Sequence, residues 1–294
     1  MVSAEQAEPG EVFSVETPSG KGAGDENFPV GSFFLPKNLR PHVATFYAFA
    51  RAIDDIADNP ELVAIDKVAR LDGFKDAILG RQDDPAYEKA IAMRESIYRT
   101  GVNENHCLDL ISAFKQDATK NRYETWADLM DYCSRSAAPV GRYLLDLHGE
   151  SELAYPLSDA LCNALQVINH LQDCKQDYQE LDRVYLPQSY LDEHGASLAD
   201  LGAEESTDEL RATIQHLAED SLHLVIQSRD LPFELKDKRL AMESATIQYI
   251  AETLARKLAR EDPVARRVEL TKLQKLSCAF RGVFSALLQG SVRS

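Results

Sequence analysis

Two segments far apart in this chain each carry a pair of aspartates at helical spacing. In residues 47–58, the side chains of Tyr47, Arg51, Asp54 and Asp58 share one side of a helix, and apolar residues occupy the other. Like charges four residues apart destabilise an isolated helix by about 0.2–0.5 kcal/mol. A bound divalent cation would offset this repulsion.

The second segment repeats the arrangement. In residues 166–177, Gln166, Asn169, Asp173 and Asp177 share one face. Acidic residues on a helix usually just face solvent, but such faces are rich in Lys and Glu, and these two stripes contain neither. Amide, phenol and carboxylate groups together favour an enclosed polar site.

The remaining sequence predicts an all-α protein. Among 294 residues, 44% are apolar, the 12 prolines and 14 glycines leave long helical tracts uninterrupted, and alternating strands or hairpin signals are lacking. Without repeats or linkers, we expect one domain, a helical bundle around a central cavity at residues 26–290, preceded by a flexible N-terminal arm at residues 1–25.

Proline and glycine positions divide the bundle into helices. We expect these at about residues 38–59, 62–79, 86–99, 104–119, 125–149, 156–184, 208–228, 232–260 and after 263. Pro139 should kink the fifth of them. Residues 191–209 are acidic and poorly periodic, which predicts a surface connection.

Composition also excludes several functions. The net charge of −16 argues against nucleic-acid binding and against electrostatic attachment to anionic lipid. The glycine-rich residues 20–24 lack the strand and the G-K-[ST] of a nucleotide loop, and no apolar run is long enough for a membrane span. Five irregularly spaced cysteines predict reduced thiols in a cytoplasmic protein, and core packing explains His170 and Cys174 better than zinc.

Three motifs resemble the squalene/phytoene synthase family, the head-to-head prenyl synthases of the isoprenoid synthase fold. They are the run 46–51 leading to Asp54-Asp55-x-x-Asp58, the stripe 166–177, and Arg183-x-Tyr185-Leu186-Pro187. The resemblance covers about residues 27–275. Within the family, the runs 25–30, 131–142 and 169–187 most resemble the hydroxysqualene synthases of bacterial hopanoid biosynthesis.

This resemblance implies roles for individual residues. It implies a magnesium site at Asp54, Asp58, Asp173 and Asp177, with Arg51 on the diphosphate and Tyr132 near the reacting carbons. Further substrate contacts would come from Tyr47, Gln166 and Asn169 beside the metals, and from Tyr249, Arg267 and Lys275 late in the chain. The other basic residues between 256 and 275 are interpreted as surface charge.

Two positions depart from the family pattern. Synthases that join two prenyl diphosphates usually carry Arg and Glu where this chain has Gln172 and Gln176. One hypothesis is a site built for a single diphosphate; the alternative is neutral change on the surface.

The resemblance therefore implies a magnesium-dependent enzyme that converts presqualene diphosphate to hydroxysqualene. It also implies coupling to a presqualene diphosphate synthase and a reductase, and a bacterial cytoplasmic location that allows peripheral membrane contact. Two alternatives stay open. One is condensation of two prenyl diphosphates to presqualene diphosphate, dehydrosqualene or phytoene, and the other is a non-catalytic interaction protein of the same fold. No nicotinamide-binding fingerprint appears in the chain.

Overall fold

The computed structural model describes residues 15–17 and 35–290, and these residues form helices and no strands. The α-helices are α1 Arg40–Asp58, α2 Ala64–Ile78, α3 Glu88–Thr100, α4 Asn105–Asp117, α5 Trp126–Ser136, α6 Ala138–Leu147, α7 Tyr155–Leu181, α8 Gln188–His194, α9 Asp208–Gln227, α10 Leu231–Glu234, α11 Lys238–Leu258 and α12 Lys272–Gly290. The all-α prediction is confirmed.

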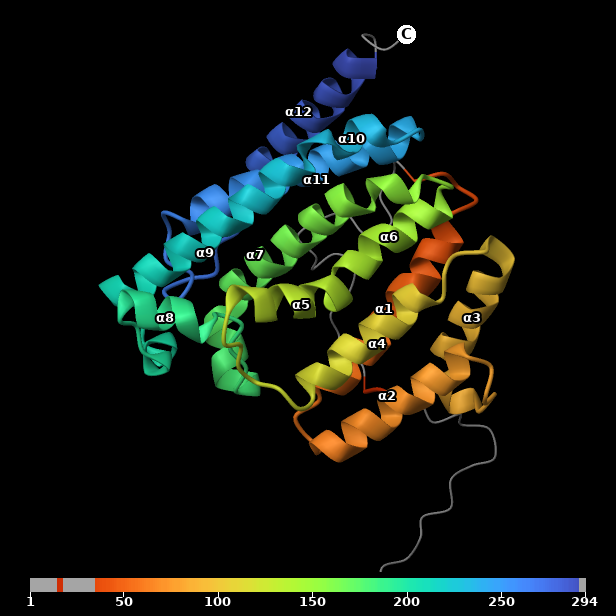
Figure 1. The fold of residues 1–294 in the computed structure, drawn as a ribbon, viewed down its shortest axis with the longest axis horizontal. Helices are drawn as coiled ribbons and strands as arrows, with labels where there is room; N and C mark the ends of the chain where they lie inside the picture. The colour runs from red at the N-terminus through yellow and green to blue at the C-terminus, as the bar shows by residue number, and fades with distance from the viewer. Residues whose placement is uncertain (1–14, 18–34, 291–294) are drawn as a thin grey trace, which may run out of the picture.

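The helices pack around two apolar clusters. One cluster joins α1 to α4 with Tyr143 and Leu147 of α6, and the other joins α5 to α11 with Cys278 of α12. In Figure 1, α7 runs through the middle of the bundle and α12 lies along its outer edge. Because α1 belongs to one cluster and α7 to the other, their two aspartate stripes can face one another across the boundary.

The sequence explains where α1 and α7 begin and end. Each has proline in its first turn, where the missing N–H removes no helical hydrogen bond. Pro60 follows the end of α1 and disfavours helical backbone at Asn59, which is extended with ψ 113°. The α7 helix ends at Asp182, whose φ of 49° is left-handed.

The expected kink at Pro139 is a complete break. Residues 126–147 form two helices, because Ala137 leaves helical geometry at φ −123° and ψ −48°. Pro139 then lies in the first turn of α6, where proline is well tolerated. Ser136 and Ala137 at this break line the main cavity of the protein.

Two other expectations need correction. The predicted surface connection at 191–209 includes the last turn of α8 and the 3₁₀ helix Leu198–Gly202, and Leu191 and Leu201 are fully buried. The last helix begins at Lys272, well after Pro263. In both places short apolar contacts outweigh a weak helical pattern, which single-sequence periodicity cannot detect.

The predicted flexible arm lies mostly outside the described residues. The three residues of it that are described, 15–17, lie against α2 and α3. Arg70 donates a hydrogen bond to the Val15 carbonyl, and the buried Glu16 forms an ion pair with Lys89. The five cysteines are free thiols, as expected. In the described part of the chain, no helix is both long and apolar enough to cross a bilayer.

Candidate active site

A cavity of about 810 Å³ lies where the two apolar clusters meet. Both helices that carry aspartate pairs contribute to its wall, and all four aspartates line it. Along α1 the lining changes from Val43 and Phe46 to Asp54 and Asp58. The α7 lining changes in the same way, from Leu161 and Leu165 to the stripe at 166–177. The cavity therefore has an apolar wall continuous with a charged one.

The aspartates of α1 are held by two arginines. Arg51, one turn earlier on the same helix, donates hydrogen bonds to Asp54 at 2.7 Å and Asp55 at 3.0 Å. Arg183, which is only 5% exposed, reaches Asp58 at 2.7 Å and the Ala57 carbonyl at 3.3 Å. Buried guanidinium groups in forked contacts hold carboxylates in fixed positions.

The aspartates of α7 have a partner from a different part of the chain. Arg267, in the segment between α11 and α12, contacts Asp173 with N–O distances of 3.0 and 3.2 Å. Its side chain is 43% exposed. Three arginines from separate segments thus meet carboxylates on one cavity wall, and together they could bind the oxygens of a polyanion.

A buried carboxyl group and two tyrosines continue the charged wall. Asp117 accepts hydrogen bonds from Tyr132 at 2.7 Å and Tyr185 at 2.9 Å. Burial raises the pKa of Asp117 to about 6, although the Arg183 charge opposes the shift. Burial, reinforced by the Asp117 charge, raises the pKa of Tyr132 well above its usual value, so its phenol stays protonated.

His170 also lies on the cavity wall, stacked on Tyr185 with ring centroids 3.5 Å apart. Its Nε2 is 3.2 Å from the Gln166 amide nitrogen, so Gln166 donates and His170 accepts. Burial, with Arg183 nearby, lowers the His170 pKa to about 3. The ring is therefore neutral at physiological pH. The expectation that His170 packs in the core holds, but the residue also faces the cavity.

The donor set suits magnesium. Magnesium takes oxygen ligands, usually one or two carboxylates with water and phosphate oxygens. Two aspartate pairs on separate helices supply such ligands on one wall. Burial and the neighbouring Asp58 charge raise the pKa of Asp54 well above its usual range, despite the opposing Arg51. A divalent cation would relieve this excess of negative charge.

The structure brings together most of the residues predicted for the site. The cavity wall includes Tyr47, Arg51, Asp54, Asp58, Tyr132, Gln166, Asn169, Asp173, Asp177 and Arg267. Tyr249 and Lys275 are not part of it. Tyr249 packs under the Arg281 guanidinium, 4.3 Å from the ring centroid, and Lys275 is exposed on α12. Tyr249 thus belongs to the contact between α11 and α12, and Lys275 lies on the protein surface.

The two glutamines that depart from the family pattern are also outside the cavity wall. Gln172 is buried, and its amide donates to the Val268 carbonyl between α11 and α12. Gln176 is exposed and contacts Glu180. The alternative of a neutral change on the surface therefore fits Gln176 but not Gln172. The Gln172 amide connects α7 to the segment that carries Arg267.

Sequence reasoning missed three members of the site. Arg183 and Tyr185 stand in a motif that carried the family resemblance, yet no role was assigned to them. Asp117 is the last residue of α4 and belongs to no spacing pattern. Only the packing of α4 against α5 brings its carboxylate to the Tyr132 phenol.

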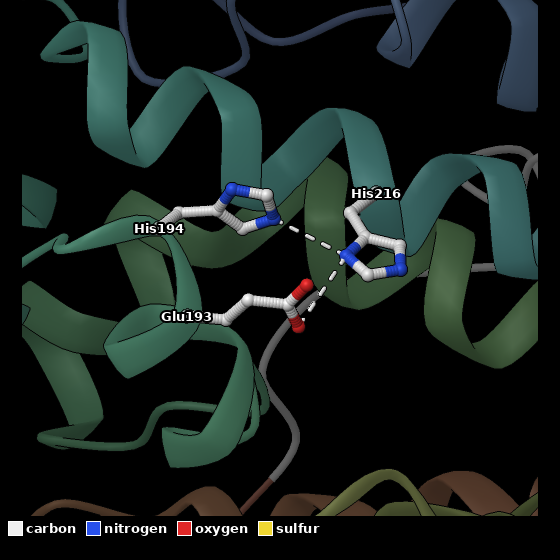
Figure 2. A group of neighbouring side chains, drawn as sticks. All are labelled: Glu193, His194 and His216. Atoms are coloured by element: carbon white, nitrogen blue, oxygen red, sulfur yellow. Dashed lines mark hydrogen bonds and ion pairs between the residues drawn. The ribbon is translucent and has the colours of Figure 1, made fainter.

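A separate cluster of possible ligands lies outside the cavity, on α8 and α9. Figure 2 shows Glu193, His194 and His216, whose ligand atoms lie within 4.8 Å of one another. The two imidazoles hydrogen-bond at 3.2 Å, and the Glu193 carboxylate is 4.0 Å from His216 Nδ1. This hydrogen bond and ion pair account for the cluster, and none of the three residues lines the cavity.

Comparisons with known proteins agree with this geometry. Residues 22–274 match the family model of squalene/phytoene synthase. The chain is 43% identical to the hydroxysqualene synthase of Zymomonas mobilis over 265 residues, covering 89% of this chain and 88% of that protein. It is 41% identical to the hydroxysqualene synthase of Rhodopseudomonas palustris, covering 94% of each chain.

A solved structure supports the fold. The squalene synthase HpnC from Alicyclobacillus acidocaldarius superposes with a TM-score of 0.69 at 35% identity, covering 79% of this chain and 87% of that one. The helical fold around one cavity, the paired aspartate motifs and these matches lead to one conclusion: this chain is a member of the squalene/phytoene synthase family, with the isoprenoid synthase fold.

Proposed function

We propose that this chain is a hydroxysqualene synthase that acts on presqualene diphosphate. The C–O bond to diphosphate breaks, the resulting carbocation rearranges to the linear skeleton, and one water then forms the new C–O bond, so that diphosphate and a proton are released. The observation that carries the proposal is the cavity, where carboxylates and arginines adjoin an apolar wall. Hydroxysqualene synthases at 41% and 43% identity support this choice of reaction.

The charged wall would bind the diphosphate. We assign Asp54, Asp58, Asp173 and Asp177 as the magnesium ligands. Magnesium would neutralise the diphosphate and assist its departure as a Lewis acid. Arg51, Arg183 and Arg267 each contact one of these aspartates. When the diphosphate binds, such a guanidinium group can exchange its hydrogen bond to a carboxylate for one to a phosphate oxygen.

The apolar wall would hold the hydrocarbon and protect the cation left by ionisation. Phe46, Leu161 and Leu165 exclude water from the chain-binding part of the cavity. The protonated phenol ring of Tyr132 is positioned to stabilise positive charge by about 1–2 kcal/mol. Gln166 and Asn169 supply polar groups where the apolar wall meets the charged one.

Condensation of two prenyl diphosphates is the second candidate. The chain is 30% identical over 247 residues to the phytoene synthase of Thermus thermophilus, which supports this alternative. Because neither Gln172 nor Gln176 lines the cavity, these two residues do not by themselves discriminate between one diphosphate and two. A non-catalytic role is disfavoured by carboxylates kept close together on a cavity wall.

One experiment separates these functions. Purified protein and Mg²⁺ are incubated with presqualene diphosphate and, in a parallel reaction, with farnesyl diphosphate, both without nicotinamide, and the lipid products are identified by mass spectrometry. Hydroxysqualene from the first reaction supports the proposal. Presqualene diphosphate or dehydrosqualene from the second supports condensation. Turnover in neither reaction, nor in a third with geranylgeranyl diphosphate, favours the non-catalytic alternative.

This function also suggests a setting for the protein. We propose that it takes its substrate from a presqualene diphosphate synthase and passes its product to a reductase. We propose a bacterial cytoplasmic location with peripheral contact to the membrane, because the product is a water-insoluble lipid. Co-purification with a presqualene diphosphate synthase and fractionation of bacterial cells would test these two points.

A further inference from the structure

The C-terminal helix α12 exposes an apolar face. Six large apolar residues of this helix are between 53% and 79% exposed: Leu273, Leu276, Phe280, Phe284, Leu287 and Leu288. At about 100° per residue they fall within an arc of roughly 120°. Scattered exposed apolar residues are ordinary, but a continuous stripe of this kind marks an interaction surface.

The opposite face of α12 explains why the stripe points outward. Small residues pack there on α11, and an added Cβ at Gly282 would lie only 2.5 Å from Thr246 Cα. Cys278 is buried beside the Tyr249 carbonyl and the Thr253 hydroxyl. Because this close contact requires small side chains, the helix is fixed with its large apolar residues facing away from the bundle.

The charge of α12 is the reverse of the charge of the whole chain. The helix contains Lys272, Lys275 and Arg281 and no acidic residue, whereas the net charge of the chain is −16. Lys272 and Arg281 flank the apolar stripe on its two sides. Residues 256–281 carry eight Lys and Arg against three Asp and Glu; Arg256, Lys257, Arg266 and Arg267 form ion pairs, and the cations of α12 itself give this edge of the molecule its positive charge.

We propose that α12 is the surface by which the protein docks on an anionic lipid bilayer. An apolar stripe flanked by cationic side chains is the pattern of a helix that lies in the membrane interface. Phe280 and Phe284, whose rings are 6.1 Å apart, would insert below the headgroups, and the flanking cations would contact lipid phosphates. The net charge of the chain argued against such attachment, but the structure separates this cationic edge from the acidic remainder.

Docking through α12 would also bring the cavity close to the lipid. The helix packs on α11, and α11 contributes Leu240, Ser244 and Ile247 to the cavity wall. A lipid product formed in the cavity would then have only one helix pair between itself and the bilayer. The docking surface itself does not depend on which prenyl diphosphate is the substrate.

The test is co-sedimentation of the full chain with vesicles, without substrate. We expect the protein to bind vesicles of phosphatidylcholine and phosphatidylglycerol at 3:1 and to bind phosphatidylcholine alone more weakly. Binding to the anionic vesicles should weaken as the salt concentration rises. The double variant Phe280→Glu with Phe284→Glu should lose at least tenfold in partitioning. The control, Ile65→Glu with Leu153→Glu, changes apolar residues elsewhere that are even more exposed, and should stay within twofold of wild type.

Equal binding by wild type and the α12 double variant, or no vesicle binding by wild type, would overturn the proposal. Sedimentation velocity tests the alternative that a second copy of the chain covers this face. If the wild type is a dimer that does not bind vesicles and the α12 double variant is a monomer, the face is an interface between two copies. Thermal melts confirm that each variant folds. Because the assay contains no substrate, its failure is distinct from failure of the proposed catalytic function.

Discussion

The two aspartate pairs resemble one another in sequence but differ in how the fold supports them. The α1 pair is held from within: Arg51 is on the same helix and Arg183 is buried against the Ala57 carbonyl. The α7 pair is held from outside by Arg267, whose side chain is 43% exposed on the segment before α12. The aspartates of the two halves are similarly exposed, so the halves differ in their arginines, which are largely buried beside α1 and lie on a surface segment beside α7.

This difference suggests a division of labour. The buried half can be in place before any ligand arrives, because its arginines are fixed by packing and hydrogen bonds. The exposed half can change as the diphosphate enters, since Arg267 can exchange Asp173 for a phosphate oxygen at little cost to folding. Substitutions in the two halves should therefore separate stability from activity.

The largest effect is expected from the aspartates themselves. Asp54→Asn and Asp173→Asn should each lower kcat by about 10²–10³-fold, because each removes a proposed ligand of the magnesium that would neutralise the diphosphate. Asp54→Asn should not lower the melting temperature, since burial and the Asp58 charge already disfavour its ionised form. Product formation and thermal melts measure both effects. Asp182→Asn, at an exposed residue paired with Arg122, is the control; retained activity in Asp54→Asn would contradict the site.

Substitution of Arg183 and substitution of Arg267 should have different effects. Arg183→Ala should lower the free energy of unfolding by about 3–5 kcal/mol, because it leaves Asp58 and Asp117 without their buried cation. Arg267→Ala should change the same free energy by less than about 1 kcal/mol yet lower kcat/KM at least about tenfold. Urea unfolding and steady-state kinetics make the comparison. Similar losses of stability in both variants would remove the distinction between core and surface halves.

His170 should make the stability of the core half depend on pH. Its folded pKa of about 3 is below the unfolded value, so its contribution is complete above about pH 6.5 and falls with pH by about 1.4 kcal/mol per unit. From pH 6.5 to 4.5 the wild type should lose about 2 kcal/mol more than His170→Phe, which keeps the stacking on Tyr185. Parallel curves in urea unfolding across this range would show that the ring titrates normally.

The smallest effect is expected at Gln176. Gln176→Glu restores the residue usual in condensing synthases, but the side chain is exposed and points to Glu180. We expect less than about 0.5 kcal/mol of change in the free energy of unfolding, and kcat within about twofold. Gain of farnesyl diphosphate condensation by this variant would show instead that Gln176 does determine substrate choice.

Sequence periodicity predicted much of the site because two helices carry most of it. Residues three or four apart share a helix face wherever that helix lies, so Asp54 and Asp58, or Asp173 and Asp177, could be grouped without a structure. Local sequence also predicted the end of α1 at Asn59, because Pro60 follows it. It failed for residues 191–209, where short buried contacts replace periodicity.

The late residues show the limit of this reasoning. The family resemblance implied substrate contacts equally for three late residues, Tyr249, Arg267 and Lys275. Only Arg267 reaches the cavity. No helical spacing relates these residues to α7, because Tyr249 lies on α11, Lys275 on α12 and Arg267 in the segment between these helices. The same holds for the charge of the molecule, whose sum hides the cationic edge on α12.

The sequence by itself determined the helical class, the two aspartate stripes and the family, because these depend on local spacing and residue type. Only the tertiary structure decided that the stripes line one cavity, that Asp117 links Tyr132 to Tyr185, and that the apolar face of α12 is uncovered in the described structure. The physical reason is that contacts between distant segments depend on how helices pack on one another. Spacing within a helix fixes the face on which a residue lies but not the partner of that face.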